Sequence, residues 1–154
     1  MDGSGLREGD YAGLCALQSC YGIIAVTRRE GKLWLVVRTA QQGEKTTQPE
    51  NNDGESKKPE SETEWAAIPL KEQQARLKLE VDFTGMKDTA TFYYWKNDEN
   101  ARKSFSGRWE KVGPDHKLYF KLDHFVGCRF GLVFYSTLEA GGTASYREFQ
   151  YRKR

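Results

Sequence analysis

Two carboxylates on one predicted strand are the first residues whose types and spacing could do chemistry. Glu80 and Asp82 alternate with apolar residues in LEVDFTG, so their side chains share one face of a strand. Two carboxyl groups that flank one glycosidic bond, about 5 to 5.5 Å apart, can hydrolyse it with retention of configuration. Such a strand carries a further glutamate two or three positions on, where this chain has Thr84 and Gly85. The row is therefore incomplete, and the pattern favours a solvated strand face over a catalytic pair.

Other patterns for catalysis or metal binding are weaker. His116 and His124 each follow an aspartate, which is common in turns, and no serine or cysteine stands in a GxSxG nucleophile elbow. Asn97–Asn100 could offer oxygen ligands to calcium, but NDEN lacks the spacing and the bidentate glutamate of an EF-hand loop. Gly141–Gly142 is too short for a phosphate-binding loop. The sequence therefore predicts no cofactor, leaves a structural calcium ion open and assigns no catalytic residue.

The aromatic residues carry the strongest binding signal. Sugars present apolar C–H faces that stack on tryptophan and tyrosine rings, while their hydroxyls need fixed polar partners. In TATFYYWK, Ala90, Phe92 and Tyr94 share one strand face, and Tyr93 and Trp95 share the other. We expect the first face in the core and the second to form a sugar platform, and coverage of both faces by loops stays open as the alternative. The candidate carbohydrate-binding residues are Tyr93, Trp95, Trp109 and Trp65, with Trp34, Tyr119 and Tyr135 as further candidates.

Apolar and polar residues alternate with a period of two along most of the chain. RLKLEVDF and KLYFKLDH alternate apolar and polar residues, as in strands with one buried and one solvated face. Other runs rich in β-branched and aromatic residues are bounded by turn residues, and no segment shows a sustained helical period. We predict an all-β chain of about ten strands in a two-sheet antiparallel β-sandwich of jelly-roll type. The other predicted strands are GIIAVTRR, KLWLVVRT, TATFYYWK, CRFGLVFYS and ASYREFQYR.

Length and charge narrow the classes of partner. The chain has 154 residues, which is about one domain, and a net charge of +2. Its only basic tract is 152–154, so the clustered positive charge of a nucleic-acid binder is absent. No apolar run reaches the roughly 18 residues of a membrane span, and 1–10 lacks the layout of a signal peptide. We predict no nucleic-acid or membrane partner, and export is not determined by these residues.

Residues 41–63 differ from the rest of the chain. They contain no large apolar side chain and are rich in Glu, Lys, Gln, Ser and Pro, so burial cannot offset the entropy of ordering them. We predict a mobile polar loop inside a single domain of residues 1–154. Cys15, Cys20 and Cys128 are odd in number and lack CxxC spacing. They are expected to be small buried side chains, with a bridge to Cys128 left open.

Several blocks of the sequence resemble one known family in the same order along the chain. GDYAGLCALQSCYGIIAV (9–26), DFTGMKDTATFYYWKN (82–97) with SGRWEKVGP (106–114), and VGCRFGLVFYSTLEAGGTASYREFQY (126–151) carry the resemblance. They are similar to strands of the C-terminal concanavalin A-like domain of family 43 glycoside hydrolases, the β-xylosidase and α-L-arabinofuranosidase group. The chain departs from the family pattern at Trp95, at a longer loop to Gly107, and at its start, where the opening strand pair is missing.

The resemblance implies a non-catalytic sandwich of concanavalin A and laminin-G type in a bacterial, secreted or cytoplasmic parent enzyme. In that family a separate five-bladed propeller carries the catalytic acids. The sandwich binds xylan in some members; in others it packs on the propeller and sends an aromatic loop to the rim of the active site. Phe125 in DHFVG is the candidate rim residue. The expected partners are the propeller and plant cell-wall xylan or arabinoxylan.

Two hypotheses from different classes follow for this chain. It is either a carbohydrate-binding module or a structural module that buttresses the propeller or an oligomer without binding sugar alone. The exposure of the Trp95 ring is the feature that discriminates between them.

Overall fold

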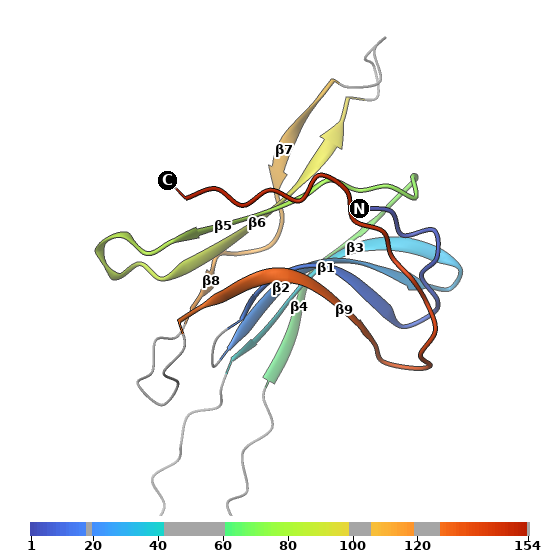
Figure 1. Cartoon of the computed structure of the whole chain (residues 1–154), viewed down its shortest axis with the longest axis horizontal. Coiled ribbons are helices and arrows are strands. Elements are labelled where there is room, and N and C mark those ends of the chain that lie inside the picture. Colours follow the sequence, from blue (N-terminus) through green and yellow to red (C-terminus); the bar gives the residue numbers. More distant parts are fainter. Residues whose placement is uncertain (18–19, 42–60, 99–105, 119–126, 154) are drawn as a thin grey trace, which may run out of the picture.

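The computed structural model describes residues 1–17, 20–41, 61–98, 106–118 and 127–153. Two antiparallel sheets lie face to face, and the C-terminal segment runs along the smaller sheet (Figure 1). The predicted fold class, an antiparallel β-sandwich, is confirmed. Within the described residues, no helix has the length and apolar character needed to cross a membrane.

The larger sheet has five strands in the order β4-β3-β2-β1-β9. Glu30 and Gly31 both have positive φ (50° and 73°), which is the two-residue turn that matches the twist of a hairpin between β2 and β3. The strands are β1 (Asp10–Leu17), β2 (Tyr21–Arg29), β3 (Lys32–Gln41), β4 (Ser61–Pro69) and β9 (Arg129–Ser136).

The smaller sheet has the order β5-β6-β7, and β8 also pairs with β6. A single 3₁₀ turn, η1 (Thr84–Met86), connects β5 to β6. The strands are β5 (Leu77–Asp82), β6 (Thr89–Asn97), β7 (Gly107–Lys111) and β8 (His116–Lys117).

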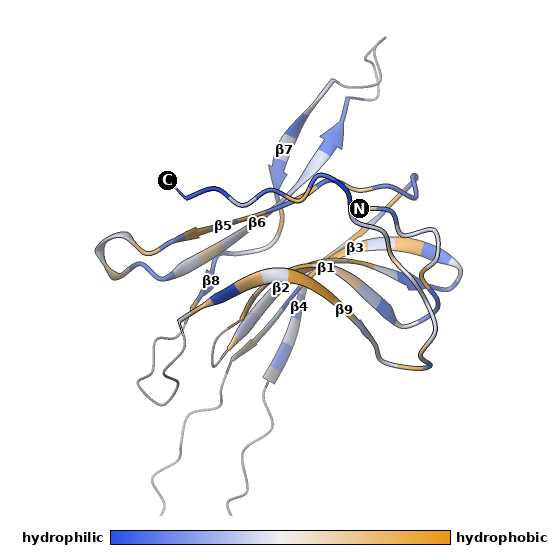
Figure 2. Ribbon diagram, in the orientation of Figure 1, coloured by the Kyte–Doolittle hydropathy of each residue, from blue (hydrophilic) through white to orange (hydrophobic). Residues whose placement is uncertain are grey.

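The core lies between the two sheets, where apolar residues gather on the facing strands (Figure 2). Phe92 of β6 is fully buried and reaches Gly22 of β2. A Cβ atom on Gly22 would lie 2.6 Å from Cζ of Phe92, so only glycine lets this ring approach the backbone of β2. Ala90 and Tyr94 are buried on the same face of β6, as the alternation predicted. The largest of the other fully buried apolar side chains are Ile24, Leu35, Leu118, Val26, Val36 and Val37.

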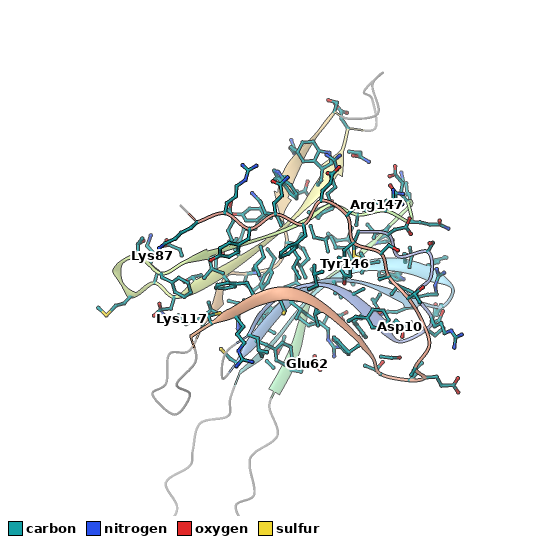
Figure 3. The ribbon with its side chains drawn as sticks, viewed as in Figure 1. Asp10, Glu62, Lys87, Lys117, Tyr146 and Arg147 are labelled. Carbon is teal, nitrogen blue, oxygen red and sulfur yellow. The ribbon has the colours of Figure 1, made fainter. Side chains whose placement is uncertain are left out.

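The predicted C-terminal strand is wrong. Residues 144–152 form no strand, and their one ladder contact is an isolated bridge from Ser145 to Asp2. Tyr146 instead points from the C-terminal segment towards β9 and donates its hydroxyl to the carbonyl oxygen of Val133 over 2.8 Å (Figure 3). Alternation alone does not make a strand: β9 is an edge of the larger sheet, yet this segment contacts it through the Tyr146 side chain and not through a backbone ladder.

The predicted polar loop, residues 41–63, is too long at both ends, because Gln41 is the last residue of β3. Residues 61–63 belong to β4, because Glu62 and Thr63 pair with Ala40 and Thr39 of β3. Residues 42–60 lie outside the described residues. Only residues 117 and 118 of the predicted strand 117–124 lie within the described residues. Of these two, Lys117 belongs to β8.

None of the three cysteines forms a disulfide. Cys20 is buried, whereas Cys15 and Cys128 are half-buried, so the prediction of buried side chains holds fully for one of the three. Burial raises the pKa of the Cys128 thiol to about 11, which keeps this thiol protonated and unreactive at neutral pH.

Candidate functional site

Three of the four predicted binding residues lie together on the outer face of the smaller sheet. Trp95 of β6 stands directly opposite Trp109 of β7, with ring centroids 5.5 Å apart and an interplanar angle of 81°. Tyr93 is two residues from Trp95 on the same strand face. We call Tyr93, Trp95 and Trp109 the tryptophan face.

Local sequence explains how Trp95 is held. Gly107 begins β7 opposite Asn97, and a Cβ atom there would lie 2.5 Å from Nε1 of Trp95. The indole therefore rests on the bare backbone of a glycine, which no other residue type would permit without a shift. Trp109 is more open, with 40% of its surface exposed, and Trp95 is half-buried.

Two cations lie over these rings. The guanidinium of Arg76 is 5.9 Å from the Trp95 centroid, and Nζ of Lys78 is 4.2 Å from the Tyr93 centroid and 5.1 Å from that of Trp109. Cation–π attraction at exposed sites is about 0.5–1 kcal/mol, enough to bias the cations towards the rings without fixing them there. The tryptophan face thus combines aromatic surface with hydrogen-bond donors.

Acceptors stand beside the same rings. Lys78 also contacts Glu80, with 3.2 Å between Nζ and Oε1. Asp115 accepts a hydrogen bond from Thr91 over 2.8 Å and forms an ion pair of 2.7 Å with Lys111. The side chain of Thr91 lies on the same side of β6 as Tyr93. Burial and the Glu80 carboxylate raise the pKa of Tyr93, so its hydroxyl stays protonated and can donate.

Two other predicted residues are not part of this cluster. Trp65 is on β4 of the larger sheet, is exposed, and donates its indole N–H to Oγ1 of Thr39 over 2.7 Å. Phe125 lies outside the described residues, as do Tyr119 and His124.

The carboxylates of the incomplete row are engaged with their neighbours. Asp82 accepts hydrogen bonds from the backbone and side chain of Thr84 and contacts Lys87 at 3.1 Å. These contacts lower the pKa of Asp82 to about 2, the Thr84 hydrogen bonds being the largest cause. A carboxyl that is ionised at neutral pH cannot serve as the general acid of glycoside hydrolysis.

The calcium candidate is described only in part. Asn97 donates to Glu72 over 3.4 Å, and the backbone N–H of Asp98 bonds to Ser106, while residues 99 and 100 lie outside the described residues. No group of three or more His, Cys, Asp or Glu side chains within the described ranges is arranged to hold a metal ion.

His116 is a buried core residue. It is 3% exposed on β8, and its Nε2 atom has no hydrogen-bond partner among the described residues. Burial lowers the pKa of His116 below its usual value of about 6.5. The imidazole is therefore neutral in the folded chain at neutral pH.

This burial predicts a dependence of stability on pH. Below about pH 6.5 the unfolded chain protonates His116 while the folded chain does not, so the free energy of unfolding falls as the pH drops towards the folded pKa. In chemical denaturation from pH 7.5 to 5, we expect wild type to lose more stability than His116→Gln. Parallel curves for the two proteins would show that His116 is not the titrating group.

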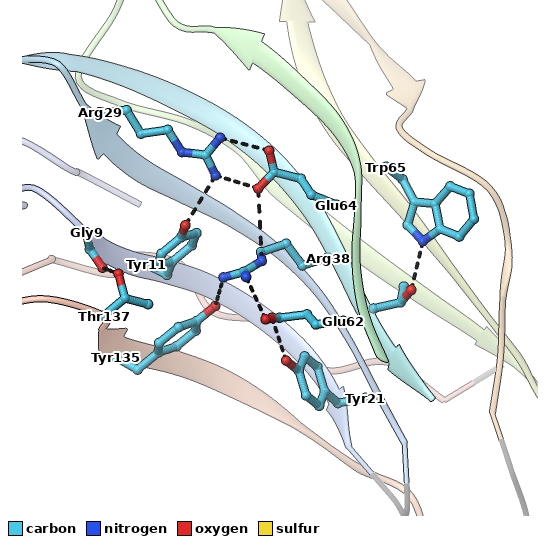
Figure 4. A network of polar contacts seen from close by, with 11 residues as sticks. Gly9, Tyr11, Tyr21, Arg29, Arg38, Glu62, Glu64, Trp65, Tyr135 and Thr137 are labelled. Carbon is cyan, nitrogen blue, oxygen red and sulfur yellow. Dashed lines mark hydrogen bonds and ion pairs between the residues drawn. The ribbon is translucent and has the colours of Figure 1, made fainter. Parts of the chain in front are cut away.

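A second polar and aromatic cluster, which the sequence did not predict as a unit, covers the outer face of the larger sheet (Figure 4). Arg29 pairs with Glu64, and Arg38 pairs with Glu62 over 2.6 Å. Three tyrosines from three different strands complete it. We call this cluster the arginine–tyrosine face: Tyr11, Tyr21, Arg29, Arg38, Glu62, Glu64 and Tyr135.

The two packed sheets define the class of the molecule: an antiparallel β-sandwich with a side-chain cluster on each outer face. The family model described as "Beta xylosidase C-terminal Concanavalin A-like domain" matches residues 1–152. The chain belongs to this family of domains from family 43 glycoside hydrolases, as its sequence blocks indicated.

The chain is also similar to a solved structure. A solved structure titled "Bifunctional GH43-CE" from Bacteroides eggerthii is 30% identical and has a TM-score of 0.68. The similarity covers 92% of this chain but only 15% of that chain. A search of curated proteins finds no match.

Proposed function

We propose that this chain is a non-catalytic accessory module of a family 43 glycoside hydrolase of the β-xylosidase or α-L-arabinofuranosidase type, and that it binds xylan or arabinoxylan. The observation that carries this proposal is the tryptophan face. A domain that places two tryptophans and a tyrosine on an outer sheet face, rather than in its core, offers a surface suited to a partly apolar ligand.

The geometry of the rings supports a sugar as that ligand. Trp109 offers its exposed ring to the apolar C–H groups of a pentose if the Lys78 side chain, whose Nζ lies 5.1 Å from the ring centroid, moves aside. Trp95 meets Trp109 at 81° and supplies a second ring at the edge of this site. Lys78 and Asp115 stand near enough to Tyr93 and Thr91 to bond hydroxyl groups at the edge of the ligand. The bound chain would lie along β6 and β7.

Catalysis is assigned to the parent enzyme and not to this module. Glu80 and Asp82 lack a third carboxylate on their strand, and Asp82 is held ionised. His116 is buried in the core. In this proposal the module raises the local concentration of xylan near a separate catalytic domain, whose identity rests on the family.

A second candidate function, structural packing against the catalytic propeller, is favoured by a separate observation. Exposed apolar side chains gather on β9 and along the C-terminal segment, where Phe130 also stacks with Tyr151 at 6.5 Å. Such a patch fits an interface with another folded domain. Its exposed members are Leu132, Phe134, Phe149 and Tyr151.

Depletion by insoluble polysaccharide tests the proposed ligand class. We expect the wild-type chain to sediment with insoluble arabinoxylan and to stay in solution with microcrystalline cellulose, because two rings that meet at 81° do not form the flat surface that a cellulose crystal face would need. Soluble xylo-oligosaccharide should release the sedimented protein. Full recovery of the chain in the supernatant with both polymers would contradict sugar binding and leave the structural role.

A further inference from the structure

The outer face of the larger sheet is built in two layers. Ile23, Ala25 and Val36 are almost fully buried although they point away from the core, and Tyr11 above them is 7% exposed. Tyr11, Trp34 and Tyr135 pack on this apolar floor, and the arginines and glutamates lie over it. A sheet face that only met water would not need such a cover.

The rings and guanidinium groups of this layer hold one another in place. Tyr11 and Tyr135 are stacked with centroids 4.9 Å apart and an angle of 4°, and the guanidinium of Arg38 lies 4.8 Å from the Tyr11 centroid. Arg38 is only 16% exposed. Side chains already fixed in this way lose little further conformational entropy when a ligand binds.

Each positive charge on this face is matched by a carboxylate. Arg29 donates from Nη1 to Oε1 of Glu64 over 2.8 Å, and Arg38 donates from Nη2 to Oε2 of Glu62 over 2.6 Å. An anion would have to displace a glutamate from these pairs, and a cation would have to displace an arginine. A neutral polar ligand leaves both ion pairs intact.

The phenol groups of Tyr11 and Tyr135 indicate which hydrogen-bonding groups such a ligand must offer. Tyr11 accepts a hydrogen bond from Arg29 over 3.2 Å and Tyr135 accepts one from Arg38 over 3.0 Å. A phenol that accepts keeps its own proton, and no acceptor for either proton is found among the described residues. Glu62 and Glu64 retain spare lone pairs, so donors and acceptors stand side by side, as vicinal hydroxyl groups require.

The cluster extends across the whole sheet. Its members come from β9, β1, β2, β3 and β4, which at the usual strand spacing is a width of about 19 Å. In Figure 1, β9 arches towards the smaller sheet, so the opposite face is the concave side of this strand. An extended ligand can lie across the strands and meet each pair in turn.

We propose that the arginine–tyrosine face is a second ligand site, separate from the tryptophan face, and that it binds an uncharged oligosaccharide across the strands of the larger sheet. The ligand class rests on the proposed function, whereas the location rests on the paired charges and the two unused phenol protons. The two sites lie on opposite outer faces of the sandwich, so one module can contact two glycan chains.

Isothermal titration calorimetry of the full chain with xylohexaose tests this site in a variant from which the tryptophan face has been removed. In Trp95→Ala/Trp109→Ala we expect saturable binding to persist. Adding Tyr135→Phe, which removes one hydroxyl but keeps the ring stack, should weaken that binding about three- to tenfold. Tyr146→Phe is the matched control, since its hydroxyl bonds to Val133 away from this face and its loss should leave affinity unchanged.

The outcomes separate the two proposals. Loss of all binding in the double tryptophan variant would overturn the second site and support the first. If the affinity for xylohexaose is unchanged by Trp95→Ala/Trp109→Ala but falls with Tyr135→Phe, the first site is overturned and the second is supported. No binding by the wild-type chain, or equal affinity for hexagalacturonic acid at the second site, would overturn the uncharged-glycan inference. Thermal melts of each variant establish that it is folded.

Discussion

Replacing both tryptophans of the tryptophan face is expected to abolish most of the binding to that face. Trp95→Ala and Trp109→Ala remove the two rings that would cover the sugar, and central aromatic residues of interfaces contribute about 2 kcal/mol or more each. Each single variant should therefore weaken binding of xylohexaose at this face by about 30-fold. Calorimetric titration of the single variants measures this.

Trp65→Ala is the matched control for these variants. Trp65 is equally large and exposed, but it lies on β4 of the other sheet and is bonded to Thr39. We expect its loss to leave affinity at the tryptophan face unchanged. If Trp65→Ala weakened binding as strongly as Trp109→Ala, the site would not be the cluster on β6 and β7.

Replacing Phe92 is expected to have the largest effect on stability. The ring is fully buried between the sheets and touches β2 at Gly22. Phe92→Ala removes it and leaves a cavity that rigid strands on both sides cannot fill, which costs about 3–5 kcal/mol of the free energy of unfolding. Urea denaturation measures the change.

The neighbouring position provides the control for Phe92→Ala. Thr91 is on the same strand but points outwards, where its hydroxyl bonds to Asp115. Thr91→Ala should cost about 1 kcal/mol. A loss of similar size in the two variants would mean that the inner face of β6 is not the core that the structure shows.

The parts of the fold that depend on residues close together in the sequence were predictable. In β6 the burial of Ala90, Phe92 and Tyr94 follows from strict alternation, which also places Tyr93 and Trp95 on the other face. Trp109 was a candidate by residue type alone, as was Trp65. Local pattern therefore placed Tyr93 and Trp95 together, whereas only the pairing of β6 with β7 adds Trp109 and leaves out Trp65 of β4.

The arginine–tyrosine face could not be predicted in the same way. Arg38 and Tyr135 meet although they are 97 residues apart, because the strand order places β9 beside β1 and not beside β8. Tyr135 was recognised only as one candidate ring. The available signal was weak: Tyr11, Tyr21 and Arg29 each begin or end a strand-like run at positions that share one sheet face.

The predicted strand at 144–152 failed for a related reason. Alternation reports which side chains prefer burial, but a strand also needs a backbone ladder, and residues 144–152 form none with β9 although β9 is an edge strand. Tyr146 satisfies its alternating pattern by packing on β9, and its hydroxyl bonds to a carbonyl of that strand. The exposed Phe149 and Tyr151 further along remain as an apolar surface.

Isothermal titration of the wild-type chain with xylohexaose and soluble arabinoxylan tests the central claim most directly. We predict saturable heat with both ligands, reduced by Trp95→Ala. That result would make the tryptophan face a binding platform. If neither ligand gives heat with a chain shown to be folded, sugar binding is contradicted and the module is left as a structural companion of its catalytic domain.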